Sequence, residues 1–399
     1  MSERVYLDAN AGLPVRPEVL TEYLRVEREC PANPASLHRA GRRAQGELES
    51  AREQVAACIG RSASEVVFAS GATEACNLAL FGIVHASSEM LGRKLNLLSS
   101  RAEHPAVLGP LRVLQQQGHS LQLLPLDPHA RVDLNQWPSD SDQQPDLVSL
   151  QWANNETGAV QDLPSMLQNL PADSLWFCDA VQGVGKLSWD TALLNADSLV
   201  LSGHKFGAPK GVGVLVLGER AMYQAHMVGG GHQRGRRPGT ESPALAAAFA
   251  MAMKLAMEEQ SQHQTEWEQA RQRFLDVLTG SLGQPAVSGW TGGAEDGVIC
   301  NHPASGGLSN TLNLSFQNLD GRLLLPTLDA EGLEVSSGSA CSSGSPTPSD
   351  VLLAVGLPQV LAGASIRVTF APKTELSTVE NSAKRLAEAI SRLYDVAKR

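Results

Sequence analysis

The chain has 399 residues, more than a single hydrophobic core normally serves, so two domains are expected. Hydrophobic residues make up 42% and charged residues 19% of the chain, a composition typical of folded soluble proteins that argues against a disordered chain. The formal net charge of −10 argues against a nucleic-acid partner, because binding phosphate backbones needs a concentrated basic surface. The one dense basic cluster, Arg234-Gly235-Arg236-Arg237, is too short to cover a duplex.

Neither a membrane span nor an export signal is expected from the sequence. No apolar run approaches the roughly 18 residues needed to cross a bilayer. The stretch from Met1 to Asp8 lacks a basic segment followed by an apolar one, so we expect a cytoplasmic protein without membrane contacts. The six cysteines lie far apart with no C-x-x-C pair, so neither a disulfide framework nor a metal site is expected; they are Cys30, Cys58, Cys76, Cys178, Cys300 and Cys341.

Short apolar runs alternate with helical stretches between about residues 47 and 217. This alternation predicts right-handed crossovers and a mostly parallel sheet with helices on both sides. Ligands of such sheets bind at the carboxyl ends of the strands. The predicted strands are 66–68, 97–98, 147–150, 175–178, 198–201 and 212–216, and the predicted helices between them are 47–59, 73–88 and 105–117.

The second half of the chain predicts a smaller α+β domain. A long helix opens after Ser242-Pro243 with apolar residues at three- and four-residue spacing, and we expect it to link the two domains. Beyond it the sequence predicts a helix at 267–280, a Gly/Ser-rich stretch at 288–310, a strand at 311–315 and a Ser-rich segment at 336–345. The predicted boundaries are 14–255 for the large domain, and 1–13 with 256–399 for the small one.

Two ionisable side chains end neighbouring predicted strands. Lys205, in Ser202-Gly203-His204-Lys205, directly follows the strand at 198–201 and can form a Schiff base with an aldehyde cofactor. Asp179 ends the preceding strand, where a carboxylate can keep a pyridine nitrogen protonated, so that the ring acts as an electron sink. Taken singly, Lys205 could be a solvated loop lysine and Asp179 a helix N-cap. Their occurrence on successive strands favours the cofactor site.

The segment Ser70-Gly71-Ala72-Thr73-Glu74 lies between a predicted strand and a predicted helix. Backbone N–H groups, including that of Ala72, and the Thr73 hydroxyl therefore converge on a helix N-terminus, which suits a dianionic phosphate. The signal is weak alone, because Ser and Thr caps followed by Glu are common in helices without ligands.

Two more motifs are expected to end predicted strand segments. His104, in Glu103-His104-Pro105, could stack on an aromatic cofactor and shuttle protons, or could be a satisfied surface histidine. The run Asn154-Asn155-Glu156-Thr157-Gly158 could hydrogen-bond a ring oxygen or a carboxylate, although such turns are usually structural. The residues alone leave both alternatives open.

The segment Ser337 to Ser345 contains Cys341 among small residues that cannot pack a core. We therefore expect Cys341 on an accessible loop with a reactive role, and expect the other cysteines to behave as small hydrophobes. Arg367 stands on a late predicted strand, where its planar fork could bind a substrate carboxylate or form a surface ion pair.

Together these motifs resemble the cysteine desulfurases of the NifS/IscS type, within the class V aminotransferase group of pyridoxal-5′-phosphate (PLP) enzymes. The resemblance runs from Tyr6-Leu7-Asp8 to Arg367 and beyond. The motifs that carry it are Asn33-Pro34-Ala35-Ser36, Ser70 to Asn77, Glu103-His104, Asn154-Asn155-Glu156, Asp179-Ala180-Val181-Gln182, Ser202-Gly203-His204-Lys205, Gly229 to Thr240 and Ser337-Gly338-Ser339-Ala340-Cys341.

The resemblance implies PLP-dependent transferase fold type I, with a mostly parallel seven-stranded sheet in the large domain. It implies the removal of sulfur from L-cysteine, giving alanine and a persulfide on Cys341 for an acceptor protein of iron–sulfur cluster assembly or thiolation. It also implies a homodimer. The implied roles are Lys205 for covalent attachment of PLP, Asp179 for the pyridine nitrogen, His104 for ring stacking, Gln182 and Asn155 for the phenolic oxygen or substrate, Thr73, Ser202, His204 and the neighbouring subunit's Thr240 for the phosphate, and Arg367 with Asn155 for the substrate carboxylate.

The sequence departs from the family pattern in two places. It has Asn10-Ala11-Gly12-Leu13-Pro14 where Ala/Ser-Thr-Thr-Pro is usual, and Gln151-Trp152-Ala153 where Met-His-Val is familiar. Both changes approach the substrate pocket, so the preferred substrate or acceptor could differ. Alternative readings are a selenocysteine lyase, a cysteine sulfinate lyase or an aminotransferase on the same fold, and a non-catalytic scaffold.

Overall fold

A seven-stranded sheet forms the centre of the larger lobe in the computed structural model, which describes residues 4–138, 144–290, 297–337 and 348–397. Its strand order is β2-β8-β7-β6-β5-β3-β4, and only β8 runs antiparallel to its neighbours. The prediction of a mostly parallel sheet is confirmed. The strands are β2 (Val66–Ala69), β3 (Asn96–Ser100), β4 (Ser120–Leu124), β5 (Leu147–Ser149), β6 (Leu175–Asp179), β7 (Ser198–Ser202) and β8 (Gly213–Leu217).

Strand β4 was not predicted from the sequence. This strand lies at the edge of the sheet and pairs only with β3. Four of its five side chains are partly or fully exposed. It therefore lacks the continuous apolar run that marks the central strands.

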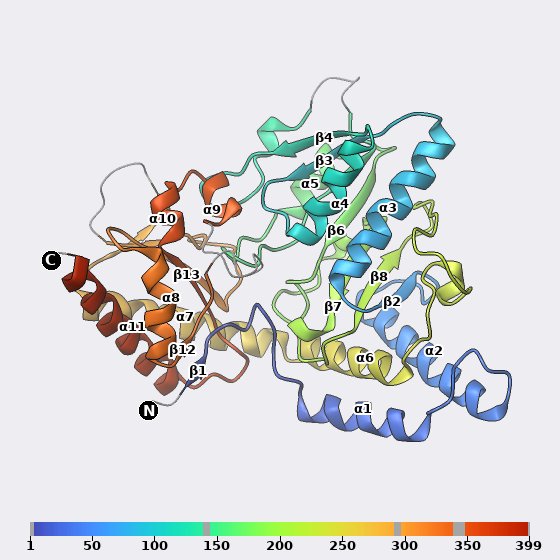
Figure 1. Cartoon of the computed structure of the whole chain (residues 1–399), viewed down its shortest axis with the longest axis horizontal. Helices are drawn as coiled ribbons and strands as arrows, with labels where there is room; N and C mark the ends of the chain where they lie inside the picture. Colours follow the sequence, from blue (N-terminus) through green and yellow to red (C-terminus); the bar gives the residue numbers. More distant parts are fainter. Residues whose placement is uncertain (1–3, 139–143, 291–296, 338–347, 398–399) are drawn as a thin grey trace.

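Helices cover both faces of this sheet (Figure 1). Along β7, Leu199 and Leu201 pack into the core on the side of α2 and α6, whereas Val200 packs into the core on the side of α3 and α4. This alternation follows from the two-residue period of a strand, and it explains why β7 is apolar throughout. The helices of the larger lobe are α1 (Pro17–Glu29), α2 (Arg39–Ile59), α3 (Ala72–Leu91), α4 (Pro105–Gln116), α5 (Leu163–Asn169) and α6 (Pro243–Glu258).

The smaller lobe contains a four-stranded sheet of order β13-β11-β10-β9 and a two-stranded parallel pair of β1 with β12. The helix predicted at 267–280 is longer in the structure, where it starts at Gln260 and ends at Leu282. The elements are β1 (Val5–Tyr6), α7 (Gln260–Leu282), β9 (Ala286–Ser288), β10 (Val298–Cys300), β11 (Thr311–Phe316), α8 (Gly321–Ala330), β12 (Leu333–Glu334), α9 (Asp350–Ala354), α10 (Gln359–Gly363), β13 (Ser365–Thr369) and α11 (Leu376–Ala397).

The two lobes are joined by α6 and α7, which meet at Glu259 (Figure 1). The chain also connects them at its start, since β1 pairs with β12 in the smaller lobe and α1 packs against α6 in the larger one. The predicted boundaries of 14–255 and of 1–13 with 256–399 stay a prediction.

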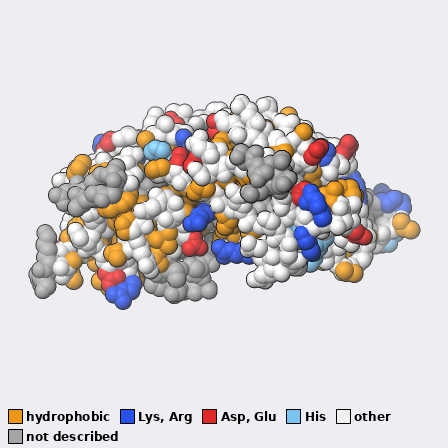
Figure 2. All heavy atoms as spheres, turned by 90° about the horizontal axis from the view of Figure 1, so that it is seen from above, with side chains coloured by type: hydrophobic (Ala, Val, Ile, Leu, Met, Phe, Trp, Pro, Cys, Tyr) orange, Lys and Arg blue, Asp and Glu red, His pale blue; other side chains and the backbone are white. Residues whose placement is uncertain are grey.

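The surface carries charged side chains of both signs. On the face seen in Figure 2, basic and acidic groups occur together where the two lobes meet, and hydrophobic side chains form only small groups. No helix in the described part of the chain is long and apolar enough to span a membrane.

Replacing Phe249 with alanine is expected to destabilise the larger lobe. Phe249 is fully buried on α6 and makes edge-to-face contacts with Phe68 and Phe206. We expect Phe249→Ala to lower the free energy of unfolding by about 3–5 kcal/mol, measured by urea denaturation, because the deleted ring leaves a cavity. Lys254→Ala on the exposed side of α6 is the control. A loss below about 1 kcal/mol for Phe249→Ala would contradict this packing.

Candidate active site

Lys205 lies at the carboxyl edge of the central sheet, as predicted. It ends the short 3-10 turn Gly203–Lys205 that directly follows β7. Its Nζ donates hydrogen bonds to the backbone oxygens of Asn10 (2.7 Å) and Ala11 (3.0 Å). Gly203 permits this tight turn, because a Cβ there would lie 2.8 Å from Ala208 and 3.0 Å from Phe249. The amine is therefore held by backbone carbonyls of the N-terminal segment.

Asp179 ends β6, the strand that pairs with β7, and its side chain is buried. One carboxylate oxygen accepts a hydrogen bond from the backbone N–H of Val181 at 3.0 Å. Burial raises the pKa of Asp179 to about 6, although the nearby charge of Lys205 acts in the opposite direction. Burial and the neighbouring Asp179 also raise the pKa of Glu103. A cationic ligand beside Asp179 would further stabilise the ionised form of this carboxyl.

The N-terminus of α3 lies beside the end of β7. Gly213, the partner of Ser202 across β7 and β8, approaches Gly71 so closely that an added Cβ would lie 2.7 Å from the Gly71 backbone. Gly71 is the N-cap of α3 and offers no side-chain cap, which leaves the first N–H groups of the helix, at Ala72 and Thr73, for another partner. The pattern Ser70 to Glu74 therefore opens a helix, as predicted.

Ser202 and His204 contact each other at this position. The Ser202 hydroxyl and His204 Nδ1 form a hydrogen bond of 3.1 Å. Burial, followed by the charge of Lys205, lowers the pKa of His204 to about 4, so the ring is neutral at pH 7. A neutral imidazole keeps one N–H that can donate to an anion.

His104 is the N-cap of α4, and its Nδ1 accepts a hydrogen bond from the backbone N–H of Ala106 at 3.0 Å. It lies four residues beyond β3, which ends at Ser100, so the expectation that Glu103-His104-Pro105 ends a strand was wrong. Burial, followed by the charge of Lys205, lowers the pKa of His104 and keeps the ring neutral. Because Nδ1 accepts this bond, the proton of the neutral ring lies on Nε2, and the ring can stack on a planar group or donate from Nε2.

Arg367 comes from β13 in the smaller lobe and is buried. Its Nη2 forms an ion pair of 2.6 Å with Asp8, and its Nη1 donates to the backbone oxygen of Asn155 at 3.1 Å. Its buried Nε has no hydrogen-bond partner among the described residues. The guanidinium is thus a buried ion-pair partner rather than a surface ion pair, and its Nε–H is not used by either contact.

Three further predicted site residues are Gln182, Thr240 and Cys341. Gln182 is buried three residues beyond Asp179, and its amide Nε2 donates to the Asn10 backbone oxygen at 3.2 Å. Thr240 is exposed on the loop that leads into α6. Cys341 lies outside the described residues. The other five cysteines are buried or, in the case of Cys58, partly buried, as expected for small hydrophobes.

Two residues near the site have no role predicted from the sequence. Asn10 was noted only as a departure from the family pattern, yet its backbone oxygen accepts from both Lys205 and Gln182. Glu156 is a half-buried carboxyl that accepts from the Ser349 hydroxyl, and desolvation raises its pKa to about 7. Both contacts join segments that are more than 150 residues apart, so no local pattern could have indicated them.

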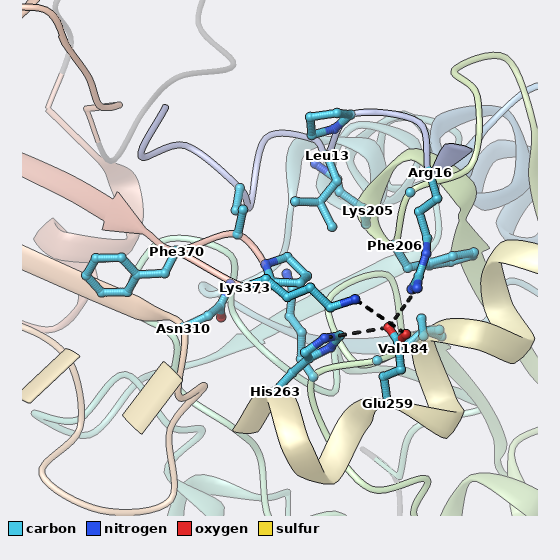
Figure 3. Close-up of a pocket in the computed structure, with 18 of the residues that line it drawn as sticks. Leu13, Arg16, Val184, Lys205, Phe206, Glu259, His263, Asn310, Phe370 and Lys373 are labelled. Carbon is cyan, nitrogen blue, oxygen red and sulfur yellow. Dashed lines mark hydrogen bonds and ion pairs between the residues drawn. The ribbon is translucent and has the colours of Figure 1, made fainter. Parts of the chain in front are cut away.

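A cavity of about 420 Å³ lies beside Lys205, between the N-terminal segment and the junction of α6 and α7. Glu259 projects into it and is approached by three basic side chains, Arg16 at 2.7 Å, His263 at 3.6 Å and Lys373 at 3.9 Å (Figure 3). These contacts join the N-terminal segment and the smaller lobe to the junction of α6 and α7.

Comparisons with known proteins agree with this geometry. Residues 5–381 match the family model described as aminotransferase class-V. A cysteine desulfurase IscS from Dictyoglomus turgidum is 33% identical over 394 residues, which cover 98% of this chain and 96% of that protein. The chain belongs to the class-V aminotransferase family. It is thus a member of a family of PLP enzymes, and its similar curated relatives include cysteine desulfurases.

Solved structures of family members have the same fold. A NifS-like protein matches with a TM-score of 0.87 and 31% identity, covering 98% of this chain and all of that one, at 100%. A structure titled "SspA in complex with cysteine" matches with a TM-score of 0.75 and 28% identity, covering 93% of this chain and 99% of that one. The fold of this class-V member is therefore fold type I.

The residues present fit PLP, the cofactor of the class-V family. Asp179 is a buried carboxyl with a raised pKa, and the positive charge of a protonated pyridine would stabilise its ionised form. The uncapped N-terminus of α3 beside Ser202 and His204 offers neutral donors for a phosphate. Lys205 lies at the neighbouring strand end, where its amine can reach an aldehyde.

The buried carboxyl of Asp179 is expected to make stability depend on pH. Its pKa is about 6 in the folded protein against 3.8 for an aspartate exposed to water, so the folded state favours the protonated form. Well below about pH 4 the carboxyl is protonated in both the folded and the unfolded state, so it does not lower the free energy of unfolding. As the pH rises from about 4 to 6, the free energy of unfolding falls. The full penalty is roughly 3 kcal/mol.

Asp179→Asn should remove this penalty from the cofactor-free protein. We expect the variant's gain in stability over the original protein to be about 2 kcal/mol larger at about pH 7.5 than at about pH 4.5, measured by urea denaturation. Asp395→Asn, at an exposed position of α11, is the control. Equal differences at both pH values would contradict the assignment.

Proposed function

We propose that this protein is a PLP-dependent cysteine desulfurase that transfers sulfur from L-cysteine to Cys341 and releases alanine. The observation that carries the proposal is the pairing of Lys205 and the buried Asp179 on adjacent strand ends of the central sheet. The 33% identity to a cysteine desulfurase over 98% of the chain supports the choice of reaction within the family.

The cofactor would be held by residues from several elements. Lys205 would attach it covalently, Asp179 would pair with the ring nitrogen, and His104 would stack on the ring. Gln182 and Asn155 would contact the phenolic oxygen or the substrate. The phosphate would be bound by Ala72, Thr73, Ser202 and His204, together with Thr240 from the neighbouring subunit.

The protein's own groups would handle the substrate and its proton. When bound, PLP supplies an electron sink for negative charge at the α-carbon. Arg367 and Asn155 would bind the substrate carboxylate, and Arg367 has a buried Nε available as a donor. Lys205 Nζ would remove the α-proton as a general base, and the neutral His104 ring would assist with later proton transfer.

Cys341 would take the sulfur in the next step. Its thiolate attacks the substrate sulfur, forming the S–S bond of a persulfide while the bond from the β-carbon to sulfur breaks. The electron pair of the broken bond stays with the carbon fragment, which is protonated and leaves as alanine. An unperturbed thiol is ionised to only a few per cent at pH 7, so the site must favour the thiolate.

The sulfur would pass from Cys341 to an acceptor protein of iron–sulfur cluster assembly or thiolation, in the cytoplasm. The shared phosphate site implies that the working form is a homodimer. L-Cysteine as the substrate is supported by the related structure whose title describes a complex with cysteine.

Replacing Cys341 distinguishes a desulfurase from other reactions on this fold. We expect Cys341→Ser to lose the persulfide and at least about 99% of alanine release, because the sulfur acceptor is removed. A selenocysteine lyase, a cysteine sulfinate lyase or an aminotransferase would keep most of its activity. The measurements are alanine release from L-cysteine and mass spectrometry of the persulfide-bearing peptide.

Two controls accompany this variant. Cys58→Ser changes a partly buried cysteine and should keep full activity. Lys205→Ala should lose the absorption at roughly 400–430 nm that PLP attached to a lysine gives. A purified protein with no such absorption would favour the non-catalytic scaffold instead.

Substitution of Arg367 tests carboxylate recognition. Arg367→Lys keeps a positive charge next to Asp8 but loses the planar fork. We expect KM for L-cysteine to rise by about tenfold or more, with a smaller change in kcat, measured by steady-state alanine release. Arg322→Lys, at an exposed position of α8, is the control. An unchanged KM in Arg367→Lys would show that the guanidinium serves only its ion pair with Asp8.

A further inference from the structure

A second lysine, Lys186, is buried close to Lys205. Only 4% of its surface is exposed, and no ion pair to its amine is present among the described residues. Instead, Nζ donates to the side-chain oxygen of Asn10 at 2.8 Å and to that of Gln182. Burial, with the charges of Lys205 and Arg367, lowers the pKa of Lys186 well below its usual value. A neutral amine still has two N–H bonds, one for each of these oxygens.

The hydrogen bond between Lys186 and Gln182 fits only one of the two possible orientations of the Gln182 amide. On its other side, Gln182 faces the backbone oxygen of Asn10, which can only accept, so the NH₂ end must point there. The oxygen end then points to Lys186, which donates to it. A flipped amide would place two oxygens about 3.2 Å apart without a hydrogen between them.

The orientation of the Asn10 side-chain amide is also defined by its hydrogen-bond partners. Its NH₂ end donates to the Asn155 backbone oxygen at 3.1 Å and to the Thr311 hydroxyl at 3.0 Å. Its side-chain oxygen accepts from Lys186 and from Asn310 at 3.1 Å. Lys186 thereby fixes the residue whose backbone oxygen accepts from Lys205, the amine that the proposed function uses.

The turn before Lys186 is packed closely against its neighbours. A Cβ on Gly183 would lie 2.0 Å from the ring of Trp152, so the backbone is packed directly on that side chain. Gly185 has a φ of +71° and approaches Ala256, a conformation that suits glycine. The backbone oxygen of Lys186 also accepts from Gln260 at 3.4 Å. Lys186 is thus directed toward the site by a rigid segment.

We propose that Lys186 is a positioning residue, which holds Asn10 and Gln182 in the orientation that Lys205 and the cofactor ring require. This inference rests on the proposed function, because the ring is the group that Gln182 would contact. An apolar side chain of the same length could fill the space, but it would leave two buried amide oxygens with fewer donors.

The test compares holoenzymes of the original protein, Lys186→Met and the exposed control Lys254→Met. We expect Lys186→Met to release PLP about tenfold faster and to show a weaker visible circular-dichroism band of the bound cofactor, since the ring is held less firmly. Lys254→Met should match the original protein in both measurements. Lys186→Gln, which keeps an NH₂ donor one bond shorter, should recover part of the visible band.

A double-mutant cycle with Asn10→Ala separates positioning from general destabilisation. If Lys186 acts through Asn10, introducing Lys186→Met into Asn10→Ala should raise the PLP release rate by less than about twofold. Full additivity, or a release rate and visible band in Lys186→Met equal to those of the original protein, would overturn the inference. If Lys186→Met does not fold, Lys186→Gln takes its place in the cycle. A wild-type protein that binds no PLP would instead overturn the proposed function.

Discussion

The active site depends on the pairing of β6 with β7, which places an acidic and a basic side chain at adjacent strand ends. Asp179 is the last residue of β6, and Lys205 follows β7 by three residues. Because both strands are buried on both faces, neither can slip in register without exposing apolar side chains. The sheet core therefore fixes the distance between the carboxyl and the amine, and it also removes the water that would stabilise the Asp179 charge.

The N-terminal segment connects this pair to the smaller lobe. Asp8 forms the ion pair with Arg367 of β13, while the backbone oxygens of Asn10 and Ala11 accept from Lys205. Asn10 also contacts Asn155 and Thr311, which belong to different lobes. A short segment thus ties the covalent-attachment residue to the carboxylate-binding residue. In the proposed reaction, this arrangement would keep the substrate's two ends in a fixed relation to the ring.

Two kinds of buried polar group serve different purposes here. Asp179 and Glu103 carry raised pKa values because burial disfavours their charged forms, so they favour a cationic ligand. Lys186 is buried without a carboxylate partner in the described part of the chain, and it donates instead to two amide oxygens. Such groups cost stability in the absence of a ligand, and their retention beside Lys205 is consistent with a site organised for binding rather than for maximum stability.

The sequence by itself determined the apolar strands of the central sheet and the placement of Asp179 and Lys205 at strand ends, because both follow from local patterns of burial and chain order. It could not determine β4, whose half-exposed edge position gives no continuous apolar run. Only the tertiary structure decided that Asp8 pairs with Arg367 and that Lys186 contacts Asn10. The first contact spans 359 residues and the second 176, and contacts at such separations are set by how the two lobes pack rather than by any local pattern.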